Sequence, residues 1–130
     1  MSTETRKRPA YAHLFWWFMF ANGGGLAALV LPVHILVQGI LGPLRIVPVV
    51  DQHYDTWVSV LGNPIVKLYV LALVALSFFH FAHRLRYLLV DFGLHAAKSV
   101  PAQVIFYGGA VVVTLVTIWV LLTTAPITFG

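Results

Sequence analysis

Five residues with ionisable or hydrogen-bonding side chains follow one another near the end of a long apolar run: His80, His83, Arg84, Tyr87 and Asp91. At ~100° per residue, all five fall within roughly one third of a helix circumference. A fixed cation in hydrocarbon costs at least ~2.5–3.5 kcal/mol, so such a cluster indicates a functional site. A histidine can donate or shuttle a proton because its unperturbed pKa lies near ~6.5. Arg84 cannot shuttle a proton, but its permanent charge can stabilise an anion.

The same basic and imidazole groups also admit a structural explanation. Arg84 and Arg86 can serve as charges that fix the topology of a membrane helix. His80 and His83 can form hydrogen bonds between helices. His34, which lies inside the first apolar run, is expected to act as such an interhelical donor. The residue types alone therefore leave a functional and a structural role open.

The composition places the chain in a lipid bilayer. Of its 130 residues, 60% are hydrophobic and 9% are charged, and the mean hydropathy is +0.90. That is too little charge to cover a water-soluble surface. Three stretches contain no Lys, Arg, Asp or Glu: residues 9–44, 68–83 and 99–130. Because a helix needs ~20 apolar residues to cross ~30 Å of hydrocarbon, we predict an all-α membrane protein, a single transmembrane anchor domain over residues 1–130. The three predicted spans are residues 14–42, 64–88 and 101–124.

The middle uncharged stretch is short, at 16 residues. Lys67 at one end and Arg84 with Arg86 at the other can lengthen it by extending their charged groups toward the two interfaces. We expect the helix to continue past the membrane surface through Tyr87 and toward Asp91. The middle span is then long enough to cross the bilayer.

The distribution of basic residues predicts the orientation. With a cytoplasmic N-terminus, only Arg45 and Lys67 lie outside. The other basic residues all lie inside: Arg6, Lys7, Arg8, Arg84, Arg86 and Lys98. We therefore predict a multi-pass membrane protein with the N-terminus in the cytoplasm and the C-terminus outside. The first apolar run is too long for the apolar region of a signal peptide, so it is expected to stay as an uncleaved anchor.

The residues that are absent narrow the chemistry. Without cysteine, the chain cannot ligate an iron–sulfur cluster, build a thiolate zinc site or form a disulfide. Any redox group must be an organic molecule, a haem held by histidine, or a centre in another subunit. The glycines at 23–25 follow no strand, so they are no dinucleotide fingerprint. No basic stripe on a soluble face points to nucleic acid.

The glycine run of the first span is typical of close helix packing. Ala21, Gly24 and Ala28 are spaced by three and four residues, and small residues let membrane helices approach each other. Pro32 is expected to kink the helix, which neighbouring helices can tolerate. A more specific interpretation is that the close approach leaves room for a flat ring.

Depth in the membrane places the aromatic residues of the first span at the same level as the polar cluster of the second span. Trp17 and Phe20 lie near the cytoplasmic entry of the first span, and His83 and Arg84 lie where the second span returns to that side. A pocket at this level would have aromatic walls, an apolar exit for a tail and donors at one end. A quinone needs that combination, because its carbonyl oxygens need donors, its reduced anionic forms need cations, and two protons must exchange with water.

The chain resembles a known family along most of its length, from Trp16 to Leu121. The similar segments are Trp16 to Gly24, Pro32, Ile40 to Leu44, His83-Arg84, Asp91, His95 and Phe106-Tyr107-Gly108. Taken together in this order, they resemble the small D-type membrane anchor subunit of bacterial fumarate reductase. The resemblance implies a non-catalytic subunit of a quinone-linked oxidoreductase complex of anaerobic respiration. It also implies a multi-pass location in the bacterial cytoplasmic (inner) membrane.

The resemblance also implies partners and a cofactor. The anchor would pair with a C-type membrane subunit and hold a flavoprotein subunit and an iron–sulfur subunit on the cytoplasmic face. Electrons would pass from menaquinone in its reduced form to fumarate. In that family the quinone site takes residues at positions that here are Trp17, Phe20, Ala21, His83 and Arg84. The family usually has Gly where Ala21 stands, which would narrow the pocket slightly.

His80 keeps a second hypothesis open. It occupies a position where D-type anchors have Cys, and with Asp91 it reproduces a spacing found in the haem-binding anchor of succinate dehydrogenases. His80 would then be one ligand of a haem b, and the second histidine would come from the partner chain. A third hypothesis is a structural membrane protein without any redox role. No other metal site is expected.

Overall fold

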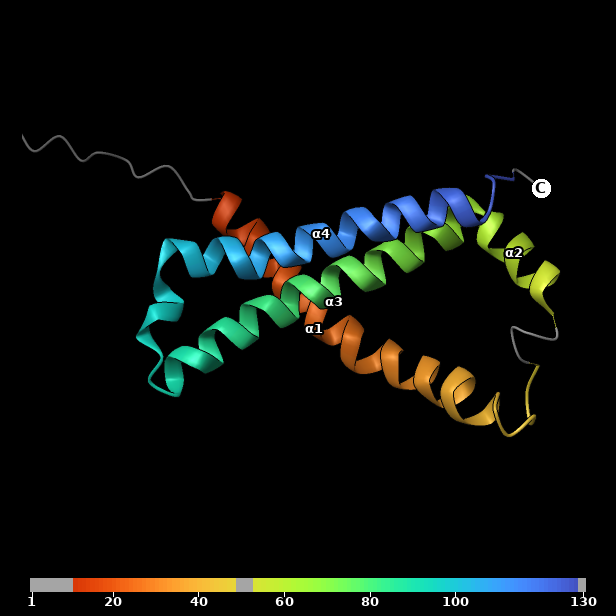
Figure 1. The fold of residues 1–130 in the computed structure, drawn as a ribbon, viewed down its shortest axis with the longest axis horizontal. Coiled ribbons are helices and arrows are strands. Elements are labelled where there is room, and N and C mark those ends of the chain that lie inside the picture. The colour runs from red at the N-terminus through yellow and green to blue at the C-terminus, as the bar shows by residue number, and fades with distance from the viewer. Residues whose placement is uncertain (1–10, 49–52, 129–130) are drawn as a thin grey trace, which may run out of the picture.

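The protein is an all-helical membrane protein. Its computed structural model describes residues 11–48 and 53–128. The elements are α1 (Tyr11–His34), the π-helix η1 (Ile35–Leu41), α2 (Tyr54–Gly62), α3 (Pro64–Asp91), the 3₁₀ helix η2 (His95–Lys98) and α4 (Val100–Thr124) (Figure 1). Within these described ranges, three stretches are long and apolar enough to cross a membrane: Phe20–Leu41, Pro64–Asp91 and Val100–Thr124. The prediction of three transmembrane helices is confirmed.

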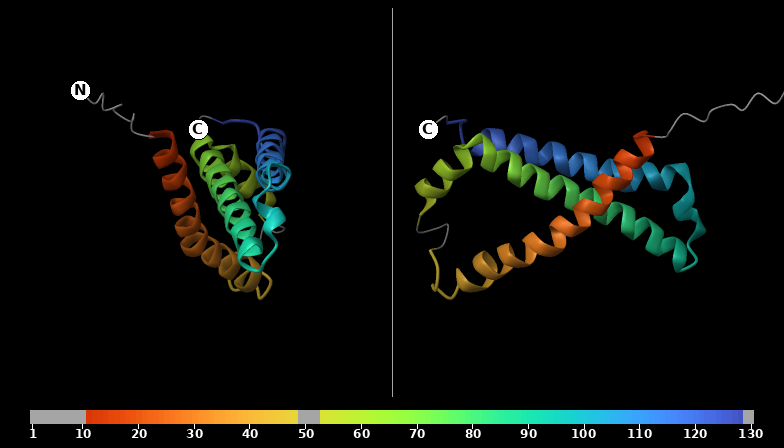
Figure 2. Two further views of the ribbon diagram at one scale, coloured as in Figure 1. Left: turned by 90° about the vertical axis from the view of Figure 1, so that its left-hand side faces the viewer. Right: turned by 180° about the vertical axis from the view of Figure 1, so that it is seen from behind.

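The arrangement centres on α3. Helices α3 and α4 run antiparallel and lie side by side, while α1 crosses α3 obliquely (Figures 1 and 2). Within the ranges that the structure describes, no large side chain is fully buried. The long helices instead expose Leu, Val, Ile and Phe side chains along their length. Such a surface is suited to lipid tails and other apolar helices rather than to water.

Local sequence signals set both ends of α3. Asn63 caps the first turn by accepting a hydrogen bond from the Ile65 main-chain N–H at 2.8 Å, and Pro64 follows at the first helical position. At the other end, Gly93 adopts a φ of 90°, a left-handed conformation that glycine adopts readily. The helix therefore continues through Tyr87 to Asp91, as expected from the sequence.

Two glycines set the approach of α1 to α3. A Cβ atom at Gly23 would lie 2.5 Å from the Leu76 carbonyl oxygen, and one at Gly24 would lie 2.7 Å from Nε2 of His80. Close packing through small residues is thus confirmed, but the predicted face is wrong in part. Ala21 and Ala28 are exposed, whereas Gly23 is buried. The face of α1 that contacts α3 is therefore rotated by about one residue from the predicted face. The spacing of small residues alone does not determine this rotation.

The first span changes its hydrogen-bonding pattern beyond Pro32. The α-helical segment continues through the proline to His34, and the π-helix η1 follows. Proline removes one N–H from the helical ladder, and wider π-type turns occur where that ladder is interrupted. The predicted discontinuity therefore takes the form of a π-helical end to the span.

Lys67, near the start of α3, is buried between helices, with only 8% of its surface exposed. Its ammonium group donates hydrogen bonds to the main-chain carbonyls of Leu121 and Ala125, the latter at 2.7 Å. The ammonium group therefore reaches the C-terminal end of α4, and its expected extension toward the interface stays a prediction. The last carbonyls of α4 have no partners within their own helix, and a lysine in the neighbouring helix can satisfy them.

Candidate functional site

The candidate site lies at the end of α3 that carries His80, His83, Arg84 and Arg86, hereafter the Arg84 end. Here α1 contacts α3 through Phe20. The Phe20 and His83 rings stack with centroids 4.7 Å apart and planes inclined by 19°. The main-chain carbonyl of Phe20 accepts a hydrogen bond from Nδ1 of His80 at 2.6 Å. The depth comparison correctly predicted that Phe20 and His83 lie together.

His83 is bordered by aromatic rings from all three long helices. Besides Phe20 of α1, it contacts the Tyr87 ring of α3 at a centroid distance of 4.8 Å. From α4, the Tyr107 hydroxyl is hydrogen-bonded to Nδ1 of His83 at 2.9 Å. The imidazole is therefore fixed by stacking on one side and by a hydrogen bond on another.

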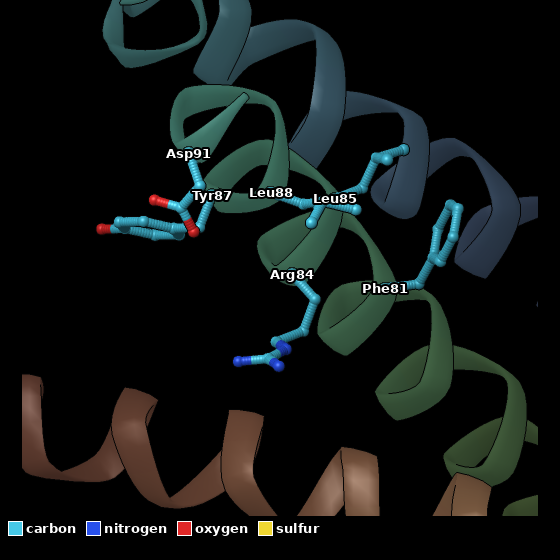
Figure 3. A pocket seen from close by; sticks show the side chains of 6 residues that line it. All are labelled: Phe81, Arg84, Leu85, Tyr87, Leu88 and Asp91. Atoms are coloured by element: carbon cyan, nitrogen blue, oxygen red, sulfur yellow. The ribbon is translucent and has the colours of Figure 1, made fainter. Parts of the chain in front are cut away.

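Arg84 is exposed and extends from α3 toward α1 (Figure 3). It lines two hollows. One has a volume of about 240 Å³ and is also lined by Phe81, Leu85, Tyr87, Leu88 and Asp91. The other is an open, mainly apolar groove of about 670 Å³, lined by Arg84 with Ala27, Leu31, Ser77, Phe78, His80 and Phe81. The guanidinium group thus lies where an apolar groove between α1 and α3 meets a more polar hollow beyond it.

Arg86 lies on the other side of α3, and only 8% of its surface is exposed. Its expected extension toward the membrane interface stays a prediction. Its guanidinium carbon lies 4.9 Å from the centroid of the Tyr87 ring and 5.8 Å from that of Tyr107. These are cation–π distances. Its Nε atom is buried and has no hydrogen-bond partner among the residues described.

The five residues predicted from the sequence divide into two groups. Phe20 and His83 are in direct contact, and Arg84 follows His83 on α3. Trp17, with 63% of its surface exposed, and Ala21 lie on the open surface of α1. The part of all five residues in quinone binding stays a prediction.

Of the two ring nitrogens of His80, only Nδ1 forms a hydrogen bond within the described part of the chain. A carbonyl oxygen only accepts, so Nδ1 of His80 must carry the proton in its bond to Phe20. Nε2 then keeps its lone pair, which is the arrangement of a metal-ligating histidine. Gly24 leaves the space that this ring fills. The described part of the chain contains no cluster of three or more His, Asp or Glu residues that could hold a metal ion by itself.

Two residues of the site were missed as functional candidates. Tyr107 was noted only as part of the family resemblance, and Arg86 only as a topogenic charge. The available signal was their position, because both lie at the same end of their helices as His83. Which face of α4 meets α3 could not be read from the sequence, because α4 contains no charged residue that would mark one face.

The fold and the site define a class: a small polytopic membrane protein with a polar, partly enclosed cluster at one end of its three spans. Comparison with known proteins is more specific. The family model for the D-type subunit of fumarate reductase matches residues 7–122. The D-type subunit of fumarate reductase from Mycobacterium tuberculosis (strain ATCC 25618 / H37Rv) is 37% identical over 123 residues, which cover 94% of this chain and 96% of the relative. Its counterpart from Shewanella putrefaciens (strain CN-32 / ATCC BAA-453) is 33% identical over 106 residues, covering 82% and 87%.

The chain therefore belongs to the family of D-type fumarate reductase subunits. It is a membrane subunit of a fumarate reductase, and so part of an oxidoreductase complex. Its three apolar helices and its family place it as a multi-pass protein of the bacterial inner membrane. The resemblance noted in the sequence is confirmed.

Proposed function

We propose that this chain anchors the catalytic subunits of a quinol:fumarate reductase and contributes a menaquinone site at the Arg84 end of α3. The quinone-binding residues are Trp17, Phe20, Ala21, His83 and Arg84. The observation that carries the proposal is the stacked Phe20–His83 pair beside an exposed arginine at the junction of two hollows.

The residues fit a quinone by their chemistry. A ring with two carbonyl oxygens needs an aromatic wall, hydrogen-bond donors and a cation, and Phe20, His83 and Arg84 are of these types. An isoprenoid tail needs an apolar channel, and the groove between α1 and α3 has a volume of about 670 Å³ with mainly apolar walls. When bound, menaquinol supplies two electrons and two protons.

The side chains would divide the work between them. Arg84 keeps its charge at all working pH values and stabilises negative charge on a bound oxygen. His83 exchanges a proton at Nε2, the ring nitrogen that is not bonded to Tyr107. Phe20 stacks on the imidazole of His83 and holds its plane. This chain supplies binding and proton exchange, and the catalytic subunits carry out the reduction of fumarate, so the isolated chain is not an enzyme.

The proposed anchoring role rests on the exposed apolar surface of the helices and on the positions of the basic residues. The exposed apolar faces of α1 and α4 suit a C-type membrane subunit and lipid. We place the Arg84 end and the N-terminus in the cytoplasm, because that orientation puts Arg84, Arg86 and Lys98 inside. The flavoprotein and iron–sulfur subunits would dock there, next to the loop that joins α3 to α4. Arg6, Lys7 and Arg8, which support the same orientation, lie outside the described residues.

The test compares two histidines that each bond to a tyrosine hydroxyl. His83→Leu should reduce menaquinol-linked fumarate reduction at least tenfold in the purified complex and flatten its pH dependence near neutrality. His34→Leu, which removes the 2.7 Å bond to Tyr69 at the other end of α3, should leave that rate within about twofold. Fumarate reduction driven by reduced viologen should be unchanged in both variants. Normal quinol turnover in His83→Leu would place the quinone elsewhere.

A haem is the second candidate, and His80 favours it. Its Nδ1 is held by a carbonyl, which leaves Nε2 as the ligating nitrogen, and the ring lines the large groove. A haem b would add electron transfer between quinone and iron–sulfur clusters. A reduced-minus-oxidised optical spectrum of the purified complex tests this candidate. A haem absorption band that is absent from His80→Phe would support it, and a spectrum without such a band would exclude it.

A further inference from the structure

Two histidines on α3 have hydrogen-bond partners of different chemistry. Nδ1 of His80 is bonded to the main-chain carbonyl of Phe20, which can only accept. Nδ1 of His83 is bonded to the hydroxyl of Tyr107, which can either donate or accept. His80 is therefore held in one tautomer when neutral, whereas His83 keeps its hydrogen bond in either tautomer.

We propose that Tyr107 is a positioning residue that lets His83 serve both the oxidised and the reduced form of the quinone. This inference rests on the proposed function. When the Tyr107 hydroxyl donates to Nδ1, Nε2 carries the proton and can donate to a quinone carbonyl. When Nδ1 carries the proton and donates to Tyr107, Nε2 has a lone pair and can accept from a quinol hydroxyl. A reversal of one hydroxyl, together with exchange of the imidazole proton with water, adapts the site without movement of the stacked ring.

The proton balance of the second arrangement is closed. Nε2 of His83 takes one proton from a quinol oxygen, so that an O–H bond breaks and an N–H bond forms, and one electron passes to the iron–sulfur subunit. The imidazolium donates its Nδ1–H to the Tyr107 oxygen and becomes neutral again by releasing the Nε2 proton to water. The second proton and the second electron leave in the same way, so that both protons and both electrons of the quinol are accounted for. Tyr107 stays protonated throughout and only changes the direction of its hydrogen bond.

The surroundings of Tyr107 fit a role in orientation. The buried guanidinium group of Arg86 lies 5.8 Å from the centroid of its ring, and Phe20 lies 6.2 Å away by ring centroids. These contacts fix the phenol ring and leave the hydroxyl to His83. The groups that border His83 or carry charge near it are Phe20 from α1, Tyr107 from α4, and His80, Arg84, Arg86 and Tyr87 from α3. Of these, Tyr107 alone is hydrogen-bonded to His83 in the described part of the chain.

The test is Tyr107→Phe in the assembled complex, since phenylalanine keeps the ring and removes only the hydroxyl. We expect kcat to fall about tenfold both for menaquinol-linked fumarate reduction and for quinone reduction by succinate, which corresponds to ~1.4 kcal/mol. KM should change by less than threefold, because Arg84 and Phe20 are untouched. Viologen-driven activity should be unchanged. Tyr69→Phe is the matched control, because it removes a tyrosine–histidine bond at the other end of α3.

The outcomes separate this inference from the proposed function. If His83→Leu abolishes quinol turnover and Tyr107→Phe does not lower it, the positioning role is wrong while the quinone site stands. If neither variant lowers turnover, the quinone site itself is wrong. Two results would show a general structural effect and overturn the role of Tyr107. One is a higher KM at unchanged kcat in Tyr107→Phe, and the other is an equal fall of kcat in Tyr69→Phe.

A double variant covers the case in which Tyr107→Phe weakens assembly. Turnover is then expressed per flavin in the complexes that do form. In the His83→Leu background, adding Tyr107→Phe should cost less than twofold further, since the hydroxyl acts only through the imidazole. Two independent losses that multiply would overturn the proposal. The ¹⁵N spectrum of labelled histidine should also lose one tautomer signal in Tyr107→Phe, and an unchanged spectrum would count against the role.

Discussion

The two ends of α3 use basic residues in different ways. At the Lys67 end, the ammonium group is buried and bonded to the carbonyls of Leu121 and Ala125, so its hydrogen-bonding capacity serves the fold. The chain end also closes onto this region, because the Thr128 N–H donates to the Gly62 carbonyl at 3.1 Å. At the Arg84 end, the guanidinium of Arg84 is exposed beside two hollows. A cation near the membrane is structural where main-chain carbonyls satisfy it, and it is available to a ligand where open space borders it.

The largest expected effect is that of Arg84→Leu. Loss of a charge-assisted hydrogen bond is worth ~1.5–3 kcal/mol, so menaquinol-linked turnover should fall roughly 10- to 150-fold at 1.4 kcal/mol per decade. Viologen-driven activity should persist. Steady-state rates on complexes matched for flavin content measure the effect, with Arg45→Leu as a control for removal of an exposed arginine. Full quinol activity in Arg84→Leu would show that this end differs from the Lys67 end only in topology.

Lys67→Met should have the opposite pattern. It leaves two carbonyls near the end of α4 without their donor, and loss of a charged donor should lower the stability of the complex by ~1.5–3 kcal/mol. Thermal unfolding of the detergent-solubilised complex should begin at a lower temperature, while quinol turnover per assembled complex stays within twofold. If the variant instead lost quinol turnover at unchanged stability, Lys67 would belong to a functional site and the comparison would be wrong.

Much of the fold could be predicted because its causes are local. Uncharged stretches and their flanking basic residues fixed the number of spans, and His34 was correctly predicted to form an interhelical hydrogen bond, which it makes with Tyr69. Phe20 and His83 could be paired because depth in a membrane follows from position along a span. Tyr107 and Arg86 could not be placed in the same way. Their contacts depend on the rotation of α4 against α3. Because α4 contains no charged residue that would mark one of its faces, its periodicity does not encode that rotation.

Gly24→Ala tests the close packing of α1 against α3. The sequence predicted Ala21 and Ala28 beside Gly24 in this contact, but the structure has Gly23 there instead. The added Cβ would lie 2.7 Å from Nε2 of His80, so the ring or the helix must shift, at a cost of ~1–3 kcal/mol. Gly25→Ala is the matched control, because a Cβ there meets nothing within 4 Å. Thermal stability of the two variants gives the comparison. Equal stability would mean that α1 does not approach α3 at Gly24.

The smallest expected effect is that of Tyr69→Phe, which removes the hydroxyl that is 2.7 Å from Nε2 of His34. A neutral hydrogen bond contributes about 0.5–1.5 kcal/mol, so the variant should show a small loss of thermal stability. Its quinol turnover should be unchanged, although the same kind of bond is removed as in Tyr107→Phe. The bond between His34 and Tyr69 joins α1 to α3, whereas the bond between His83 and Tyr107 joins α3 to α4 beside Arg84. If both variants lowered quinol turnover equally, the histidine–tyrosine pairs would act through the packing of the helices in general, and the distinction between a structural and a functional end of α3 would fail.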